Sequence, residues 1–144
     1  MSEVQSYQNH VRRTPGYYNA AALVLLSNIL WSGYRLVGGF SVDTVIAFLV
    51  SIALMVMAFA ARTQTLTVQN RVIRLEQRLR FRAVLAADVA ARAAALPLDQ
   101  IVALRFASDA ELPGLVNDVL SGQVSSSKDI KQKVKDWQGD FLRA

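Results

Sequence analysis

The residue types that most often carry out chemistry in proteins are scarce in this sequence of 144 residues. It has no cysteine and a single histidine, His10, which excludes a disulfide framework, a thiolate or iron–sulfur site and an imidazole cluster for zinc. Four carboxylates stand where helix starts or solvated helix faces are expected: Asp88, Asp99, Asp109 and Glu111. Because no paired carboxylates, nucleophile with a base or metal cluster recurs, we expect no catalytic residue, no metal, no cofactor and no enzyme.

Arginines are the one set of chemically distinctive side chains that gathers along the chain. Segment 62–82 holds six arginines against Glu76, a net charge of +5. Basic side chains beside a bilayer are attracted to anionic headgroups by ~1 kcal/mol each. The candidates for contact with lipid headgroups or a partner protein are Arg62, Arg71, Arg74, Arg78 and Arg82. Nucleic acid is not expected as a partner, because no binding motif accompanies these arginines.

The element that positions the arginines is predicted to be an amphipathic helix. Segment 62–82 contains no glycine or proline, and Val68, Val72, Leu75 and Leu79 recur at steps of four, three and four residues. This apolar stripe could lie in the membrane interface, pair with a second copy as a short coiled coil, or be buried under the chain's own C-terminal helices. We expect the last, since two heptads are too few to indicate a coiled coil.

Two apolar segments precede this helix. Residues 1–61 hold five charged side chains, whereas residues 62–144 hold thirteen basic and nine acidic ones. Segments of about 17–37 and 44–61 are each close to the length that crosses ~30 Å of hydrocarbon as a helix. Paired glycines and Asp43 between them predict a tight loop, so we expect a transmembrane hairpin over residues 17–61. A signal peptide and a buried hairpin of a soluble protein are the alternatives, disfavoured by the long apolar core and the lack of a polar face.

Several side chains of the hairpin are candidates for defined contacts. Interfacial anchors at the headgroup level are Tyr17, Tyr18, Trp31, Tyr34 and Arg35. Arg35 could also meet Asp43 across the hairpin. Intramembrane contacts are expected at Ser27, Asn28, Ala47 and Ser51, because amides and hydroxyls in hydrocarbon need hydrogen-bond partners and small residues allow close approach. Packing between the two spans is the simpler expectation, and contact with a partner protein is the alternative.

The distribution of arginines predicts the orientation of the hairpin. Arg12 and Arg13 precede the first span and the arginine helix follows the second, while the connecting loop offers only Arg35 against Asp43. Since basic residues are retained on the cytoplasmic side, both termini are expected to face the cytoplasm.

Residues 83–144 are predicted to form a small cytoplasmic helical domain. An alanine-rich helix ends before Pro97, and a second short helix turns Ile101 and Leu104 inward. Ser108 and Glu111 fit a capping box for a helix that ends at Gly122. Ser126 with Asp129 repeats this pattern before a last helix, whose predicted apolar stripe is Ile130, Val134, Trp137 and Phe141.

Charge complementarity suggests how this domain is held. Residues 83–122 carry a net charge of −3, opposite in sign to the +5 of segment 62–82. We therefore expect the acidic segment to dock on the arginine helix, with Asp99 and Asp109 as the carboxylates to test. The predicted architecture is all-α: a cytoplasmic segment 1–16, the hairpin 17–61, the arginine helix 62–82 and the helical domain 83–144.

Four motifs resemble a family of small bacterial two-span membrane proteins that is catalogued as a domain of unknown function. They are SYQNH, LTVQNRVIRLEQRLR, LRFASDAELPGLV and KDIKQKVKDWQGDFLR. The resemblance covers nearly the whole chain and implies a bacterial origin and the layout described above. It implies no activity and no catalytic or binding residues.

These observations favour a non-enzymatic, multi-pass protein of the bacterial inner membrane with both termini in the cytoplasm. The first hypothesis is an accessory or scaffold subunit of a larger membrane complex, such as an energy-transducing one, with other membrane proteins and anionic lipids as partners. The alternative is a self-assembling homo-oligomer that organises lipids, signals or forms a pore. A transporter is disfavoured because neither span carries a central ionisable residue.

Overall fold

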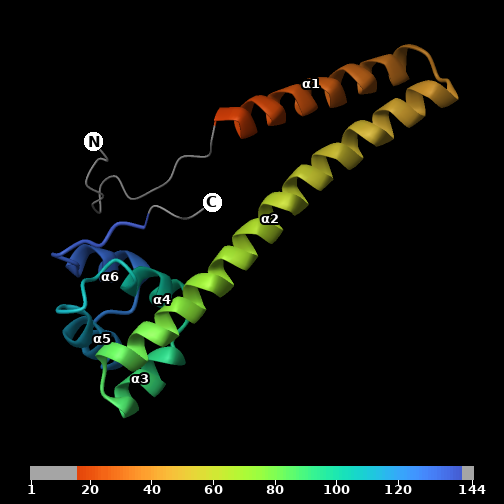
Figure 1. The fold of residues 1–144 in the computed structure, drawn as a ribbon. Coiled ribbons are helices and arrows are strands. Elements are labelled where there is room, and N and C mark those ends of the chain that lie inside the picture. The colour runs from red at the N-terminus through yellow and green to blue at the C-terminus, as the bar shows by residue number, and fades with distance from the viewer. Residues whose placement is uncertain (1–15, 141–144) are drawn as a thin grey trace. The chain divides into compact units, whose positions relative to one another are not determined.

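The computed structural model describes residues 16–140, and the regular elements in this range are helices (Figure 1). They are α1 (Gly16–Gly38), α2 (Val42–Val84), α3 (Ala87–Ala94), α4 (Leu98–Leu104), α5 (Leu112–Leu120) and α6 (Ser127–Lys133). The predicted all-α fold, with two long apolar helices followed by short ones, is therefore confirmed. The described chain divides into two compact units between Thr65 and Leu66, and each unit is treated by itself below.

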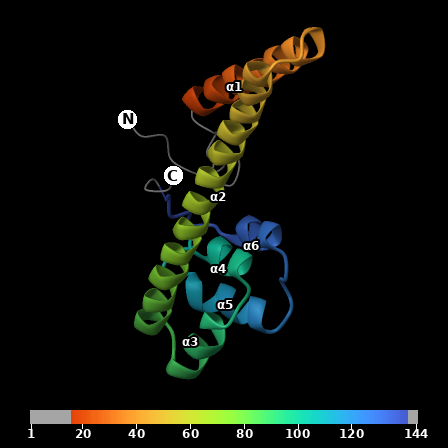
Figure 2. The same ribbon diagram turned by 90° about the vertical axis from the view of Figure 1, so that its right-hand side faces the viewer.

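The first unit is a helical hairpin, in which α1 and the first half of α2 run antiparallel (Figures 1 and 2). Helix α2 starts through a reciprocal cap, because the Thr44 amide donates to Ser41 Oγ at 3.2 Å and the Ser41 amide donates to Thr44 Oγ1 at 3.0 Å. This arrangement satisfies two backbone donors at the helix start, and Asp43 in the first turn complements the positive end of the helix dipole. The predicted loop and second helix start are thereby confirmed.

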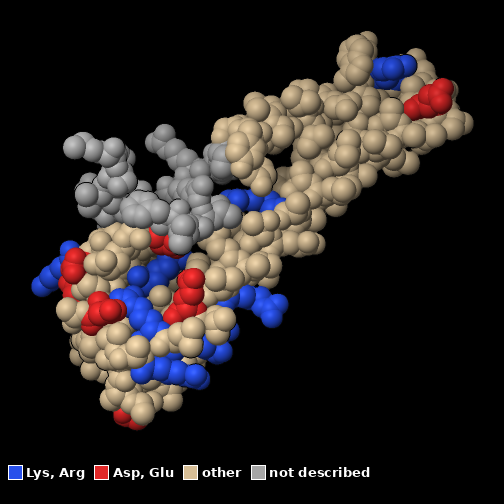
Figure 3. Space-filling view, in the orientation of Figure 1, with Lys and Arg blue, Asp and Glu red and all other residues tan. Residues whose placement is uncertain are grey.

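Both helices of the hairpin are long and apolar enough to cross a membrane. Of the most apolar window of each helix, 6% is buried in α1 and 11% in α2. Charged side chains are nearly absent from the surface of the hairpin and gather on the helical domain (Figure 3). A core helix of a soluble protein is mostly buried, so the exposure of these apolar surfaces argues against that alternative.

The second unit, residues 66–140, is a helical domain built on the last part of α2. Phe81 of α2 is fully buried among side chains from α3 to α6. Other fully buried large side chains of this core are Ile101, Leu104, Leu112, Val116 and Ile130. Burying a side chain of this size stabilises a fold by ~1.5–3 kcal/mol. The inward orientation predicted for Ile101 and Leu104 is confirmed.

The face of α2 that packs against the domain is a different one from that predicted. Ile73 and Gln77 are 5% and 7% exposed on the buried face, in line with Phe81. The predicted stripe is exposed instead, with fractions of 59%, 48%, 61% and 58% for Val68, Val72, Leu75 and Leu79. The expectation that the domain covers this stripe is therefore wrong. The periodicity of the sequence identifies one apolar face of α2, but the helix has two faces that the domain could bury. Tertiary packing buries the face that carries Phe81.

The start of α3 differs from the prediction, whereas two other boundaries of the short helices are as predicted. Helix α2 runs on to Val84, and a turn at Leu85 and Ala86 separates it from α3, although the alanine-rich segment was predicted as one helix. Leu85 is half-buried against the core, so tertiary packing overrides the local helix propensity of alanine. The predicted break before Pro97 is confirmed, and so is the end of α5, where Gly122 adopts a φ of +79°.

The predicted capping box at Ser108 does not form. Helix α5 starts at Leu112, after Glu111, and Ser108 Oγ is buried without a hydrogen-bond partner. Glu111 accepts hydrogen bonds at 3.1–3.2 Å from the backbone amides of Lys135 and Asp136 instead. The carboxylate thus holds the C-terminal segment against α5, a long-range role that a local motif does not show.

The last helix is shorter than predicted. It is capped by Ser126, which accepts from the Asp129 amide at 3.1 Å as expected, but it ends at Lys133. Trp137 lies beyond it in extended backbone, bridges to Ala107 and stacks on Phe106 with ring centroids 4.4 Å apart. The predicted single stripe through Val134 and Trp137 is therefore wrong, and Phe141 lies outside the described residues.

A pair of serine variants tests the corrected helix starts. Ser126→Ala should lower the free energy of unfolding of the full chain in detergent by ~1 kcal/mol, because it removes a working N-cap. Ser108→Ala should leave this free energy unchanged or raise it, because it removes a buried hydroxyl without a partner. Equal losses in the two variants, measured by denaturant unfolding, would contradict this description.

Candidate interaction surfaces

A pair of serines joins the two helices of the hairpin. Ser32 of α1 and Ser51 of α2 are 5% and 2% exposed, and their Oγ atoms lie 3.5 Å apart. Each hydroxyl also donates to a carbonyl of its own helix, Ser32 to Asn28 at 2.7 Å and Ser51 to Ala47 at 2.8 Å. Because both hydroxyls are satisfied within the hairpin, they link the helices without exposing polar atoms to an apolar surrounding.

The helices also approach closely at Gly33. A Cβ added at Gly33 would lie 3.3 Å from the Phe48 ring, tighter than an ordinary van der Waals contact. Glycine therefore lets the Phe48 ring pack directly against the backbone of α1. Neither Ser32 nor Gly33 was among the predicted contacts, although small residues in general are enriched where helices approach closely in membranes.

The predicted intramembrane contacts are only partly brought together. Ser51 lies in the helix interface as expected, but its partner is Ser32. Ser27, Asn28 and Ala47 have exposed side chains, so the hairpin itself does not bury them. Within residues 16–140, the Asn28 side chain makes no hydrogen bond. Contact of Asn28 with a further helix stays a prediction.

A small polar hollow of about 130 Å³ lies between the helices near the loop. Its lining consists of Asn28, Trp31, Ser32, Arg35, Asp43, Thr44 and Ala47. Arg35 and Asp43 share this hollow, but no ion pair joins them within the described part of the chain. The idea that the two charges meet across the hairpin is therefore not supported by this geometry.

Aromatic side chains mark both ends of α1, at the positions predicted for interfacial anchors. The rings of Tyr17 and Tyr18 lie 4.8 Å apart near its start, and those of Trp31 and Tyr34 lie 5.9 Å apart near its end. All four are exposed, between 38% and 70%. Such pairs are suited to the headgroup region of a bilayer, where rings with one polar group are favoured.

Next to Tyr18, the hairpin opens into an apolar hollow of about 230 Å³. Alanines at positions 21, 22 and 58 leave this space between the helices, and Leu25, Met55 and Phe59 complete its wall. Arg62 lies at its edge with the guanidinium carbon 5.5 Å from the centre of the Tyr18 ring, a cation–π distance. Arg62 is thus positioned by the hairpin, unlike the other four candidate arginines, which belong to the helical domain.

Those four arginines differ in their surroundings. Arg71 and Arg82 are exposed, whereas Arg74 is half-buried and its Nε atom has no hydrogen-bond partner. Arg78 is exposed but donates from Nη2 to the Ala94 carbonyl oxygen at 3.3 Å. The predicted row is therefore divided between structural and solvent-facing side chains.

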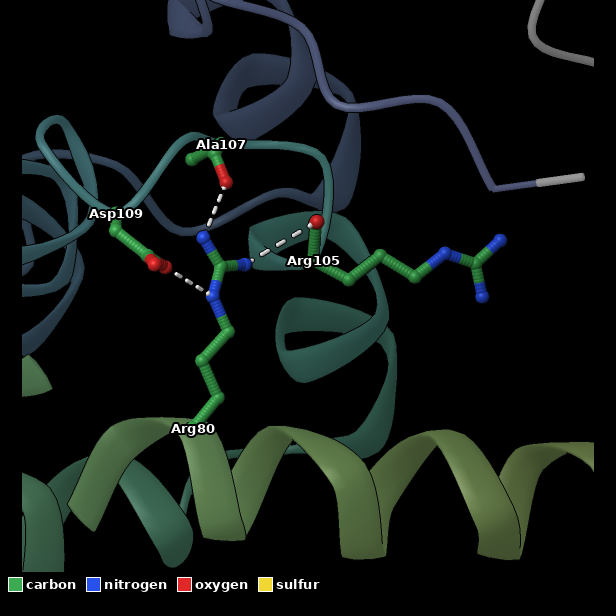
Figure 4. A network of polar contacts seen from close by, with 4 residues as sticks. All are labelled: Arg80, Arg105, Ala107 and Asp109. Atoms are coloured by element: carbon green, nitrogen blue, oxygen red, sulfur yellow. Dashed lines mark hydrogen bonds and ion pairs between the residues drawn. The ribbon is translucent and has the colours of Figure 1, made fainter. Parts of the chain in front are cut away.

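Arg80, which the sequence analysis left out of the row, makes the most extensive polar contacts of the arginine helix (Figure 4). Its Nε donates to Asp109 Oδ1 at 2.7 Å, Nη2 to the Ala107 carbonyl at 2.7 Å and Nη1 to the Arg105 carbonyl at 3.3 Å. The guanidinium thereby closes the turn that follows α4. The expected docking through Asp109 is confirmed, whereas Asp99 is exposed and forms no ion pair among the described residues.

Two further ion pairs hold the C-terminal segment of the domain. Arg105 reaches Asp140 at 3.4 Å, and Lys133 reaches Asp118 at 2.8 Å. Over residues 16–140, no three histidine, cysteine, aspartate or glutamate side chains gather as metal ligands would. Of the four carboxylates that were expected at helix starts or on solvated helix faces, Asp109 and Glu111 act here as acceptors for distant groups of the domain.

The sequence profile of one protein family matches residues 1–144, the entire chain. The chain belongs to the family of unknown function DUF6526. No curated protein and no solved structure matches it. Membership confirms the resemblance to an uncharacterised family, and it assigns no activity to the surfaces described above.

A double cysteine variant tests the hairpin interface. In this chain without cysteine, Ser32→Cys combined with Ser51→Cys should form an intramolecular disulfide on mild oxidation, because the two side chains already face each other. Ser27→Cys combined with Ser51→Cys is the matched control and should stay reduced. Oxidation of the control at the same rate, measured by thiol alkylation and mass spectrometry, would contradict the observed pairing.

Substitution of two arginines tests the polar contacts of the domain. Arg80→Ala should lower the free energy of unfolding by ~1–3 kcal/mol, because it leaves two backbone carbonyls without their donor. Arg82→Ala removes an exposed side chain and should change it by less than ~0.5 kcal/mol. Hydrogen exchange of the α4 and α5 amides in the detergent-solubilised chain measures the difference, and equal protection in both variants would refute the assigned role.

Proposed function

We propose that the protein is a non-enzymatic integral membrane protein and serves as an accessory or scaffold subunit of a larger membrane complex. In this proposal the hairpin crosses the inner membrane of a bacterium twice, with both termini in the cytoplasm. The apolar, exposed surfaces of α1 and α2 and the excess of arginine after the second span support this placement.

The observation that carries the proposal is the position of Asn28. It is the thirteenth of the 23 residues of α1, so it would lie near the middle of the bilayer. Its amide is exposed on the hairpin surface, and in the described structure it has no hydrogen-bond partner. An amide facing hydrocarbon costs free energy unless another helix supplies a partner. A further membrane protein that contacts α1 would supply one.

The helical domain supports a scaffolding role in a second way. Four of its carboxylates, Asp109, Glu111, Asp118 and Asp140, take part in ion pairs or hydrogen bonds that hold the domain together. Glu111 and Asp118 line one pocket, but each already accepts hydrogen bonds from the domain itself, Glu111 from the amides of Lys135 and Asp136 and Asp118 from Lys133. What the domain offers is a rigid, folded surface beside the membrane. Anionic lipid headgroups are proposed as additional partners, through Arg62 at the end of the second span beside the interfacial Tyr18.

Purification of the tagged full chain from its native membrane tests the proposal. The chain should stay in the membrane after an alkaline carbonate wash, and in mild detergent it should co-elute with other integral membrane proteins in constant ratio. Asn28→Leu should reduce the co-eluting proteins about threefold to thirtyfold, since an interhelical hydrogen bond contributes ~0.6–2 kcal/mol.

Val24→Leu is the matched control, because Val24 is 68% exposed on the same helix and carries no polar group. It should leave the co-eluting proteins unchanged. A wild-type chain that leaves the membrane with carbonate would refute the membrane placement. A chain that elutes without any other membrane protein under every mild condition would refute the subunit role.

A further inference from the structure

We propose that the exposed stripe of α2, formed by Val68, Val72, Leu75 and Leu79, is the contact surface for a second copy of this chain, with the two α2 helices aligned in parallel. The inference rests on the proposed membrane anchoring, but it does not require any other protein. It commits to a homodimeric contact within the 66–84 part of α2.

The first support is that the described residues, 16–140, leave this stripe exposed. All four side chains are about half exposed or more, between 48% and 61%. The domain packs on the other side of the helix, where Ile73, Gln77 and Phe81 are buried. At about 100° per residue, Leu75 and Gln77 point in roughly opposite directions. The helix therefore has one face for its own domain and another free for a partner.

The second support is the spacing of the stripe. With Val72 and Leu79 at heptad position a and Val68 and Leu75 at position d, the steps of four, three and four residues match a coiled-coil seam. Val72 and Leu75 combine a β-branched residue at a with leucine at d, as in parallel dimers, whereas Leu79 and Val68 show the reverse, so the seam residues alone do not set the number of strands. Arg82, at the next d position, ends the seam just before α2 itself ends at Val84.

The charged residues beside the seam favour a second copy of the chain as the partner and a parallel alignment of the two α2 helices. In this register Arg71 takes position g and Glu76 position e, five residues later, which are the positions that face each other across a parallel dimer. Both side chains are exposed, and in the described structure neither forms an ion pair or hydrogen bond. A parallel dimer would join each Arg71 to Glu76 of the other copy, twice by symmetry.

Other arrangements fit these charges less well. An antiparallel dimer brings g positions together and e positions together, so Arg71 and Arg78 would face arginines and Glu76 would have no arginine opposite it. A helix lying on anionic lipid usually has basic residues on both sides of its apolar face. Here one side has Arg71 and Arg78, whereas the other has Gln69, Glu76 and Ala83. The asymmetry favours a second copy over a lipid surface.

A seam of two heptads is marginal for free peptides, because they must first form a helix. In this protein the helix is already held by the domain on its other face, so association does not carry that cost. Anchoring in one bilayer also gives both copies the same direction and a high effective concentration. Under these two conditions, a seam of two heptads is long enough to hold the dimer together.

Crosslinking through single cysteines tests the contact in membranes that contain the full chain. Leu75→Cys and Val68→Cys should give a disulfide-linked dimer on mild oxidation, because facing d positions lie close in a parallel dimer. Thr67→Cys is the matched control, since Thr67 is exposed but points to heptad position c, away from the seam. Its dimer yield should be at least fivefold lower.

Charge exchange in the Leu75→Cys background tests partner and direction. Arg71→Glu should reduce the dimer yield severalfold, since it places carboxylates opposite each other, and Glu76→Arg should do the same with guanidinium groups. The two substitutions together should restore the yield, because the pair is rebuilt with exchanged charges. All three sites are exposed, so the domain fold is not at stake.

Four outcomes would overturn the inference. They are no dimer at Leu75 and Val68, an equal yield at Thr67, crosslinking of Leu75 to a different protein, and no rescue in the double variant. Each of these can occur with the hairpin still embedded in the membrane, so they leave the proposed function standing. Release of the chain by carbonate would refute the proposed function instead.

Discussion

The four short helices of the domain, of seven to nine residues each, depend for their stability on one shared core, to which α2 contributes Phe81. Helices this short are marginal in water on their own, because nucleation fixes several residues for few hydrogen bonds. Phe81 adds a fully buried side chain to the core that these helices form together, and Arg80 beside it binds the turn after α4 through three acceptors. The domain is therefore a set of short helices that stabilise one another around one core and are joined to α2 through Phe81 and Arg80.

The hairpin faces a different requirement, because in an apolar surrounding its polar groups find no hydrogen-bond partners outside the protein. Its solution is local: Ser32 and Ser51 satisfy their hydroxyls on their own helices while they touch each other, and Ser41 and Thr44 cap the start of α2 reciprocally. Asn28 is the exception, because its side-chain amide is exposed and makes no hydrogen bond among the described residues. The two units therefore satisfy their polar groups differently. The hairpin uses hydrogen bonds within its own helices, whereas the domain uses contacts between residues distant in the sequence.

The sequence predicts well whatever depends on neighbours along the chain. The lengths of the apolar helices, the turn at the paired glycines, the break before Pro97 and the cap at Ser126 are local and were predicted correctly. The failures all involve distant partners. Glu111 binds amides 24 and 25 residues away instead of capping its own helix, and Trp137 follows Phe106 instead of a helical stripe. Arg80 differs from its neighbouring arginines only through what folds onto it, which periodicity does not encode.

The two helices of the hairpin are not equally close along their length. Near the loop, Gly33 admits the Phe48 ring to within 3.3 Å of where a Cβ would stand and the hollow measures about 130 Å³, whereas alanines leave a hollow of about 230 Å³ beside Tyr18 at the other end. A hairpin with this taper, placed across a bilayer, occupies more area in one leaflet than in the other. Its free energy would then depend on the lateral pressure of that leaflet, and acyl chains that fill the hollow would restore the van der Waals contacts that the alanines leave unmade.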